Sequence, residues 1–267
     1  MPIALRFPIA LVLSIVCLAV PAWAVFQAGM DAYDRKDYAT ALREFRPLAE
    51  QGDAYSQYIL GVMYVEGKDI PQDYVQARQW FEQAAAQGMA QAQSNLGVLY
   101  ANGQGVPQDY VQARQWYEQA ANKGFASAQS SMGIIYLNGQ GVSENYQQAL
   151  RWYRLAANQG DTRAQAKLGF MYQRGIGVPQ DYDQARQWYE KAAAQGDARA
   201  QYNLGVRYAR SHGVPQDYVQ AHKWFNLAAA NGEKRGAMFR DVLAKQMTSA
   251  QIDEAEKLAR EWKPTTP

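Results

Sequence analysis

The sequence has very few of the residues that build disulfides, thiol active sites or metal centres. Its 267 residues include one cysteine, Cys17, and two histidines, His212 and His222. A lone cysteine excludes a disulfide within the chain. Neither histidine has another histidine or a cysteine at ligand spacing, so the sequence predicts no metal site. Both histidines are predicted to face solvent.

The chain also lacks a strong excess of charge and the motifs of common enzymes. Its formal net charge of +2 does not supply the concentrated basic surface of a nucleic-acid-binding protein. Three Gly-x-Gly pairs are followed by Pro107, Ser143 or Pro179 and not by a third glycine, which is typical of turns and not of phosphate-binding loops. No serine or cysteine stands in a nucleophile motif within the repeats described below. The sequence therefore predicts neither catalysis nor a cofactor.

The only long apolar run lies near the N-terminus. Arg6 is the one charge before an apolar segment at 8–20, and Ala22-Trp23-Ala24 follows with the small-x-small pattern of a signal-peptidase site. This predicts a signal peptide, cleavage after Ala24 and an exported protein, periplasmic or secreted, with no membrane span afterwards. A retained anchor is the alternative, although the run is shorter than the roughly 20 residues of a membrane-spanning helix. Lipid attachment at Cys17 is disfavoured, because Val16 and not a small residue precedes it.

What the sequence does contain is a repeat of 36 residues. Five tryptophans keep this step, at Trp80, Trp116, Trp152, Trp188 and Trp224. Two series of glycines, beginning at Gly61 and Gly88, keep it as well. A strict period of this length indicates a stack of equivalent supersecondary units. The predicted organisation is a signal peptide at 1–24, an N-terminal capping unit at 25–52, five repeats at 53–88, 89–124, 125–160, 161–196 and 197–232, and C-terminal capping helices at 233–267.

Each repeat is predicted to be a helical hairpin, as the unit 89–124 illustrates. Its first half carries apolar residues at helical spacing up to Gly103, which can end a helix in the left-handed conformation. Asp109 begins a second helix as its N-cap, and Gln112 is predicted to complete a capping box. Gly97 is predicted to lie where the two helices approach closely. Trp116 is predicted to pack between units, with a ladder of ligand-stacking rings as the alternative.

The segment 96–124 reads LGVLYANGQGVPQDYVQARQWYEQAANKG and resembles the Sel1-like repeat (SLR), a branch of the tetratricopeptide repeats. The resemblance covers the five repeats, and the N-terminal unit resembles an ordinary tetratricopeptide repeat. It implies an all-α fold, a right-handed α-solenoid of stacked helical hairpins. It also implies a non-enzymatic scaffold of a bacterial envelope that binds proteins. In unit five, Ser211-His212 replaces the usual Gly-Gln, so the first helix is expected to extend or the loop to bend differently.

By this resemblance, the first helices of the repeats line a concave groove that holds a protein or peptide partner. The early units offer apolar positions and the last two units offer cations, which suits an extended peptide with an acidic segment or a carboxylate. Solvated surface charges are the alternative interpretation. The predicted groove residues are Tyr55, Tyr58, Asn95, Arg163, Lys167, Phe170, Arg174, Arg199, Tyr202, Asn203 and Arg210.

Two other functions remain open at this stage. A peptidoglycan-binding protein could use the same tyrosines and arginines. A β-lactam-processing enzyme is less favoured, because the relatives with that association carry a disulfide in every repeat, and no repeat here contains a cysteine. The oligomeric state and the partner cannot be read from the sequence.

Overall fold

The computed structural model describes residues 21–265, which form fourteen helices and no strand. In chain order these are α1 (Ala22–Asp34), α2 (Tyr38–Glu50), α3 (Ala54–Glu66), α4 (Tyr74–Ala86), α5 (Ala90–Asn102), α6 (Tyr110–Asn122), α7 (Ala126–Asn138), α8 (Tyr146–Asn158), α9 (Thr162–Arg174), α10 (Tyr182–Ala194), α11 (Ala198–Arg210), α12 (Tyr218–Ala230), α13 (Lys234–Ala244) and α14 (Ser249–Glu261). The apolar run at 8–20, with Cys17, lies outside the described residues. The predicted cleavage motif, residues 22–24, begins α1. None of the described helices has the length and apolar character needed to cross a membrane.

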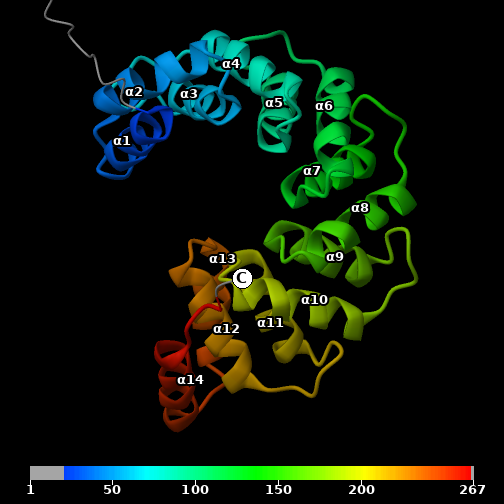
Figure 1. The fold of residues 1–267 in the computed structure, drawn as a ribbon. Coiled ribbons are helices and arrows are strands. Elements are labelled where there is room, and N and C mark those ends of the chain that lie inside the picture. The colour runs from blue at the N-terminus through cyan, green and yellow to red at the C-terminus, as the bar shows by residue number, and fades with distance from the viewer. Residues whose placement is uncertain (1–20, 266–267) are drawn as a thin grey trace, which may run out of the picture.

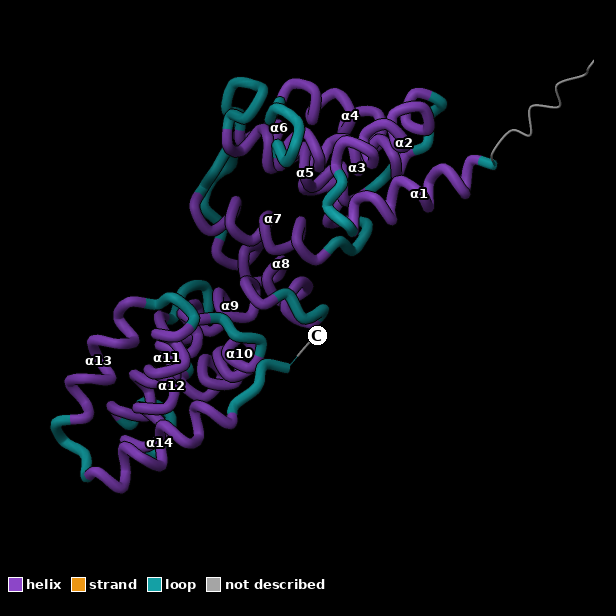
Figure 2. The backbone as a smooth tube through the Cα atoms, turned by 90° about the vertical axis from the view of Figure 1, so that its left-hand side faces the viewer, coloured by secondary structure: helices purple, strands orange, loops and turns teal. Residues whose placement is uncertain are grey.

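The helices pack as sequential hairpins, which confirms the predicted all-α solenoid. Helices α1 to α13 pack mainly against their neighbours in the chain, and α14 packs against α12. Figure 1 shows the hairpins following one another round an open arc, with the odd-numbered helices on its inner side. The view turned by 90° shows that the stack also advances, so that α1 and α14 lie at opposite ends (Figure 2). The first helix of every repeat therefore faces the inner surface.

The second helix of each repeat begins at the predicted N-cap, but not with the predicted capping box. The Asp109 carboxylate accepts hydrogen bonds from the backbone N–H groups of Val111 and Gln112 at 2.8 and 3.0 Å. The backbone N–H of Asp109 is already bonded to the carbonyl oxygen of Tyr100 at 2.9 Å. The Gln112 side chain is therefore not needed at that group, and the capping-box prediction was wrong. Among the described helices, a complete capping box occurs at α14, between Thr248 and Gln251.

Glycine permits the close approach of the two helices in each hairpin, as predicted. A Cβ atom added to Gly97 would lie 2.6 Å from the ring of Tyr117. The same relation holds one repeat later between Gly133 and Tyr153. A side chain at these positions would force the helices apart, so the recurring glycine fixes the geometry of the hairpin.

The tryptophans pack between units. Trp116, on α6, is partly buried against the core formed by α4 and α5. Trp152 contacts the core of the following junction in the same way. Each ring thus covers the apolar residues of the preceding unit. This agrees with the prediction that the tryptophans pack between units and not with a ladder of ligand-stacking rings.

A ladder of glutamines, which the sequence interpretation missed, also joins the units. Gln57 donates from Nε2 to the carbonyl oxygen of Ala49 at 3.0 Å and accepts at Oε1 from Gln87 at 2.9 Å. The buried positions of this ladder recur every 36 residues, at Gln57, Gln93, Gln129, Gln165 and Gln201. Each glutamine lies on the first helix of one hairpin and donates a hydrogen bond to a carbonyl oxygen in the last turn of the preceding hairpin, where the helix itself supplies no donor. The constant step was the signal that could have revealed it.

Candidate partner-binding groove

A pocket of about 350 Å³ opens on the inner surface between α7, α9 and α11. Five of the predicted groove residues line this pocket together. The sequence could place them on equivalent helix faces but could not show that they lie close to one another. These are Arg163, Lys167, Phe170, Arg199 and Asn203. Ser130, Ile134, Ala166, Tyr189 and Asp197 complete its wall. Residues of three successive repeats therefore form one site.

The wall of this pocket is cationic. Arg163 is exposed, donates from Nη2 to Ser127 Oγ at 3.0 Å and pairs only loosely with Asp161, at 3.8 Å. The one carboxylate of the wall, Asp197, accepts from the backbone N–H of Ala200 at 2.7 Å as the N-cap of α11. With three cations and this single carboxylate, which is directed at a helix terminus, the wall keeps an excess of positive charge.

An apolar surface accompanies the cations. Phe170 lies on the inner face of α9, and 39% of the residue is exposed. Ile134 of α7 lies on the same wall. An exposed aromatic ring beside positive charges can hold an apolar side chain while the cations bind an adjacent acidic group.

Three predicted groove residues of the last two repeats lie elsewhere. Arg174 and Arg210 are exposed at the C-terminal ends of α9 and α11 and do not line this pocket. Tyr202 is buried, with a relative exposure of 9%. It packs against Phe225 and Phe239, and the guanidinium of Arg235 covers its ring at 4.4 Å. Tyr202 is therefore not available to a partner, because α13 of the C-terminal cap covers its end of the groove.

The predicted residues of the N-terminal half form separate hollows. Tyr55 contacts the ring of Phe26 edge-on, with ring centroids 5.6 Å apart, in a pocket next to α1. Tyr58 is half-buried, and burial raises its pKa while contact with Asn95 partly offsets that effect. Asn95 lines a small apolar pocket with Val62 and other residues of α3 to α5. The groove is therefore a row of hollows and not one continuous channel.

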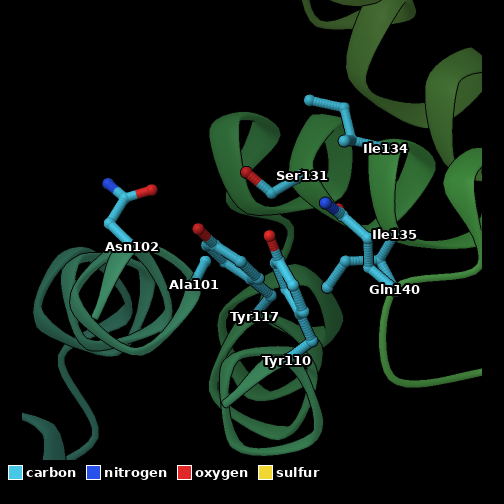
Figure 3. Close-up of a pocket in the computed structure, with 8 residues that line it drawn as sticks. All are labelled: Ala101, Asn102, Tyr110, Tyr117, Ser131, Ile134, Ile135 and Gln140. Carbon is cyan, nitrogen blue, oxygen red and sulfur yellow. The ribbon is translucent and has the colours of Figure 1, made fainter. Parts of the chain in front are cut away.

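One of these hollows occurs in the same register at two junctions between repeats. Between units two and three it has a volume of about 210 Å³, and the side chains of Tyr110 and Tyr117 point into it beside Ser131 (Figure 3). Burial raises the pKa of Tyr117 to about 12, so this hydroxyl stays neutral and can donate a hydrogen bond. The pocket that contains Asn95 occupies the same register 36 residues earlier. We call this recurring hollow the junction pocket.

Two further residues of unit five differ from their predictions. His222 is buried, with 2% relative exposure, so the prediction that it faces solvent was wrong. It lies on α12, which packs against both α13 and α14, and the equivalent Leu150 of the third unit is also buried, at 3%. Ser211 adopts the left-handed conformation, φ 59°, of the glycine that it replaces. The helix is therefore not extended and the turn keeps its shape, contrary to expectation.

Comparison with known proteins identifies the repeats. The family model described as Sel1 repeat matches residues 54–89, 90–125, 126–161, 162–197 and 198–233. A comparison with curated protein sequences gives no significant match.

Solved structures of the same kind resemble the chain over most of its length. A protective antigen of uropathogenic Escherichia coli strains, which displays an SLR fold, is 35% identical with a TM-score of 0.78. The match covers 90% of this chain and 54% of the antigen, so this chain spans about half the antigen's length. A Sel1 repeat protein from Oxalobacter formigenes is 32% identical with a TM-score of 0.77, covering 91% of this chain and 99% of that one. With five matching repeats across more than half of its sequence, the chain belongs to the Sel1 repeat family of scaffold proteins.

Proposed function

We propose that the protein binds an extended, acidic segment of a partner protein in the cationic pocket between α7, α9 and α11. The observation that carries the proposal is the convergence of Arg163, Lys167 and Arg199 around the exposed ring of Phe170. Guanidinium and ammonium groups bind carboxylates, and the aromatic ring provides contact area for an apolar neighbour. The partner segment therefore combines acidic residues with at least one apolar side chain.

We place this binding in a bacterial envelope or secreted setting. The support is the N-terminal sequence, in which one arginine precedes an apolar run and an Ala-x-Ala site. Expression of the full chain in a bacterium, followed by mass spectrometry of the N-terminus of the periplasmic protein, tests it. A mature chain that begins at Val25 supports export, and an intact chain found in the cytoplasm contradicts it.

The peptide-binding proposal can be tested with a random twelve-residue phage-displayed library. The wild type is expected to enrich peptides that contain aspartate or glutamate next to an aromatic or aliphatic residue. The charge-reversed variant Arg163→Glu, Lys167→Glu, Arg199→Glu is expected to bind a synthetic enriched peptide at least tenfold more weakly by fluorescence anisotropy. Its circular dichroism should match the wild type, because all three side chains lie outside the core.

A matched control reverses three exposed cations that lie outside this pocket. Arg43, Arg151 and Lys257 are exposed on α2, α8 and α14, and their reversal to glutamate changes the net charge equally. This control is expected to keep the affinity of the wild type. An equal loss of peptide affinity in both triple variants, or an enriched pool of peptides without acidic residues, would contradict the proposal.

A further inference from the structure

Arg207 breaks the repeat at a core position. The equivalent residues of the other four units are Met63, Leu99, Ile135 and Met171. All four are buried and belong to the hydrophobic core, and Arg207 is equally buried, with 2% relative exposure. A guanidinium therefore replaces an aliphatic side chain in the interior of the solenoid. Removing a charge from water is unfavourable unless a partner compensates for it.

The acceptors that surround Arg207 are neutral. Its Nη1 donates to the carbonyl oxygens of Tyr182 and His212, both at 3.2 Å, and its Nη2 donates to Gln173 Oε1 at 3.3 Å. Its Nε is buried and has no hydrogen-bond partner. The rings of Tyr182 and Tyr189 lie 5.3 and 5.4 Å from the guanidinium carbon. These contacts hold the group in place, but none of them neutralises its charge.

The register of the junction pocket places further basic side chains next to Arg207, at the junction between units four and five. In the register of Figure 3, Arg207 takes the place of Ile135, Arg174 that of Asn102 and His212 that of Gln140. The His212 ring stacks on Tyr182 with centroids 5.2 Å apart. Arg174 is exposed at the end of α9. The guanidiniums of Arg207 and Arg174 both act on the Tyr189 hydroxyl, where they oppose the rise in pKa that burial causes.

We propose that this basic cluster, at the junction pocket position between units four and five, binds a carboxylate. Arg174 and His212 contact the anion at the rim, and Arg207 beneath them supplies a fixed positive charge. The Asp183 carboxylate attracts Arg207 without forming an ion pair with it, and a bound carboxylate adds the closer compensation that Arg207 lacks. The cluster also explains why unit five departs from the repeat at both the core position and the turn.

The carboxylate has two sources that share this chemistry, a chain end and an acidic side chain. Tyr189, and by register Asn203, belong both to this junction pocket and to the larger pocket of the proposed function. A peptide held in the larger pocket can therefore extend into the junction pocket. The binding of a peptide carboxylate at this junction rests on the proposed function, whereas the binding of a small carboxylate such as acetate does not.

Sodium acetate is the probe for the site itself, with acetamide as its uncharged counterpart at constant ionic strength. The arginine Nε–Hε resonances of ¹⁵N-labelled protein are expected to shift saturably with acetate and not with acetamide. The variant Arg207→Met restores the residue of Met171, so it should melt at the same or a higher temperature. Its acetate affinity is expected to fall at least fivefold.

The exposed variant Arg174→Gln separates binding from folding. It is expected to weaken acetate binding at least threefold without a change in melting temperature. An acetate response that is linear in the wild type, or unchanged in both variants, overturns the inference. A lower melting temperature for Arg207→Met with unchanged acetate affinity does the same, because it shows that Arg207 only fixes the turn.

Two peptides enriched on the larger pocket then distinguish the sources. One keeps a free C-terminus and has its acidic side chains replaced by amides, and the other is C-terminally amidated and keeps them. The peptide whose carboxylate occupies the junction pocket should lose at least fivefold in affinity for Arg207→Met. If neither peptide distinguishes that variant from the wild type while the Arg163, Lys167 and Arg199 reversal abolishes binding, the inference for peptides fails and the proposed function stands.

Discussion

At the scale of single residues, the glutamine ladder contains one defect. At the other junctions the buried glutamine accepts a hydrogen bond from an amide at the end of its own hairpin, for example Gln165 from Gln195 at 2.9 Å. In the second repeat that end residue is Lys123, whose ammonium group bonds to the carbonyl oxygen of Gly88. The Oε1 atom of Gln93 is consequently buried without a partner. An unsatisfied buried acceptor lowers stability.

The substitution Lys123→Gln is expected to repair this defect. Its amide can donate to Gln93 Oε1 as Gln195 does to Gln165, which should raise the free energy of unfolding by about 1 kcal/mol. For a chain of this size that corresponds to a rise of about 2–4 °C in melting temperature, measured by calorimetry. Lys123→Met, which removes the charge without adding an amide, is the control and should give no gain. Equal effects of the two substitutions would show that the missing hydrogen bond is not the cause.

The 36-residue pattern predicted the roles of some single residues and not of others. Asp109 was identified correctly because it caps the backbone of the adjacent turn, and Gly97 because its recurrence every 36 residues marks a contact between helices that leaves no room for a side chain. The capping box failed because the Tyr100 carbonyl, nine residues away, already binds the N–H that Gln112 was to occupy. Arg207 was missed although the aliphatic residues at its position in the other units, such as Leu99, already predict a buried site; the departure of unit five from that series was the signal.

At the scale of helices, the C-terminal cap changes the environment of the last repeat. Helix α12 is covered by α13 and α14, and His222 becomes buried beneath them. Burial lowers the pKa of His222, and Arg240 on α13 lowers it further, while Glu256 on α14 and Asp241 on α13 act in the opposite direction. Its Nδ1 has no hydrogen-bond partner. The folded state therefore favours the neutral ring.

Acidification is expected to destabilise this cap through His222. Because the folded pKa lies below the unfolded value of about 6.5, the unfolded chain binds the proton more readily. The contribution of His222 to stability is present above that value and is lost as the pH falls through the folded pKa. His222→Leu, which introduces the residue that the third unit has at the equivalent Leu150, should show a smaller fall in melting temperature between pH 7.5 and 5. Parallel pH profiles for the two proteins would exclude His222 as the titrating group.

The sequence predicted which helix faces line the inner surface within the five repeats, but not where the C-terminal capping helices cover the last repeat. Arg163, Lys167 and Arg199 were assigned to the inner face from the register together with the family resemblance, and they do converge in one pocket. Tyr202 has the same register but lies under Phe239 and Arg235 of α13. The capping helices do not follow the repeat, so their path over the last unit could not be derived from it.

At the scale of the whole molecule, the solenoid has no common core. Its buried residues form successive clusters, each built from adjacent hairpins, and helices contact mainly their neighbours in the chain. Stability in such an array is a sum of unit and interface terms, so that distant units influence one another weakly. The row of separate pockets on the inner surface follows from the same construction, because each hollow lies at a junction.

This construction predicts that damage to one hairpin stays local. Gly97→Ala places a Cβ atom against the ring of Tyr117, and the resulting strain should lower stability by roughly 1–3 kcal/mol. Hydrogen exchange followed by mass spectrometry should then show faster exchange in α5, α6 and α7 and unchanged exchange in α10 to α12. Gln91→Ala, an exposed substitution on the same helix, should leave all of these rates unchanged. Uniformly faster exchange along the whole chain in Gly97→Ala would instead show that the units unfold as one cooperative block, and the pockets of the groove would then have to be treated as a single coupled surface.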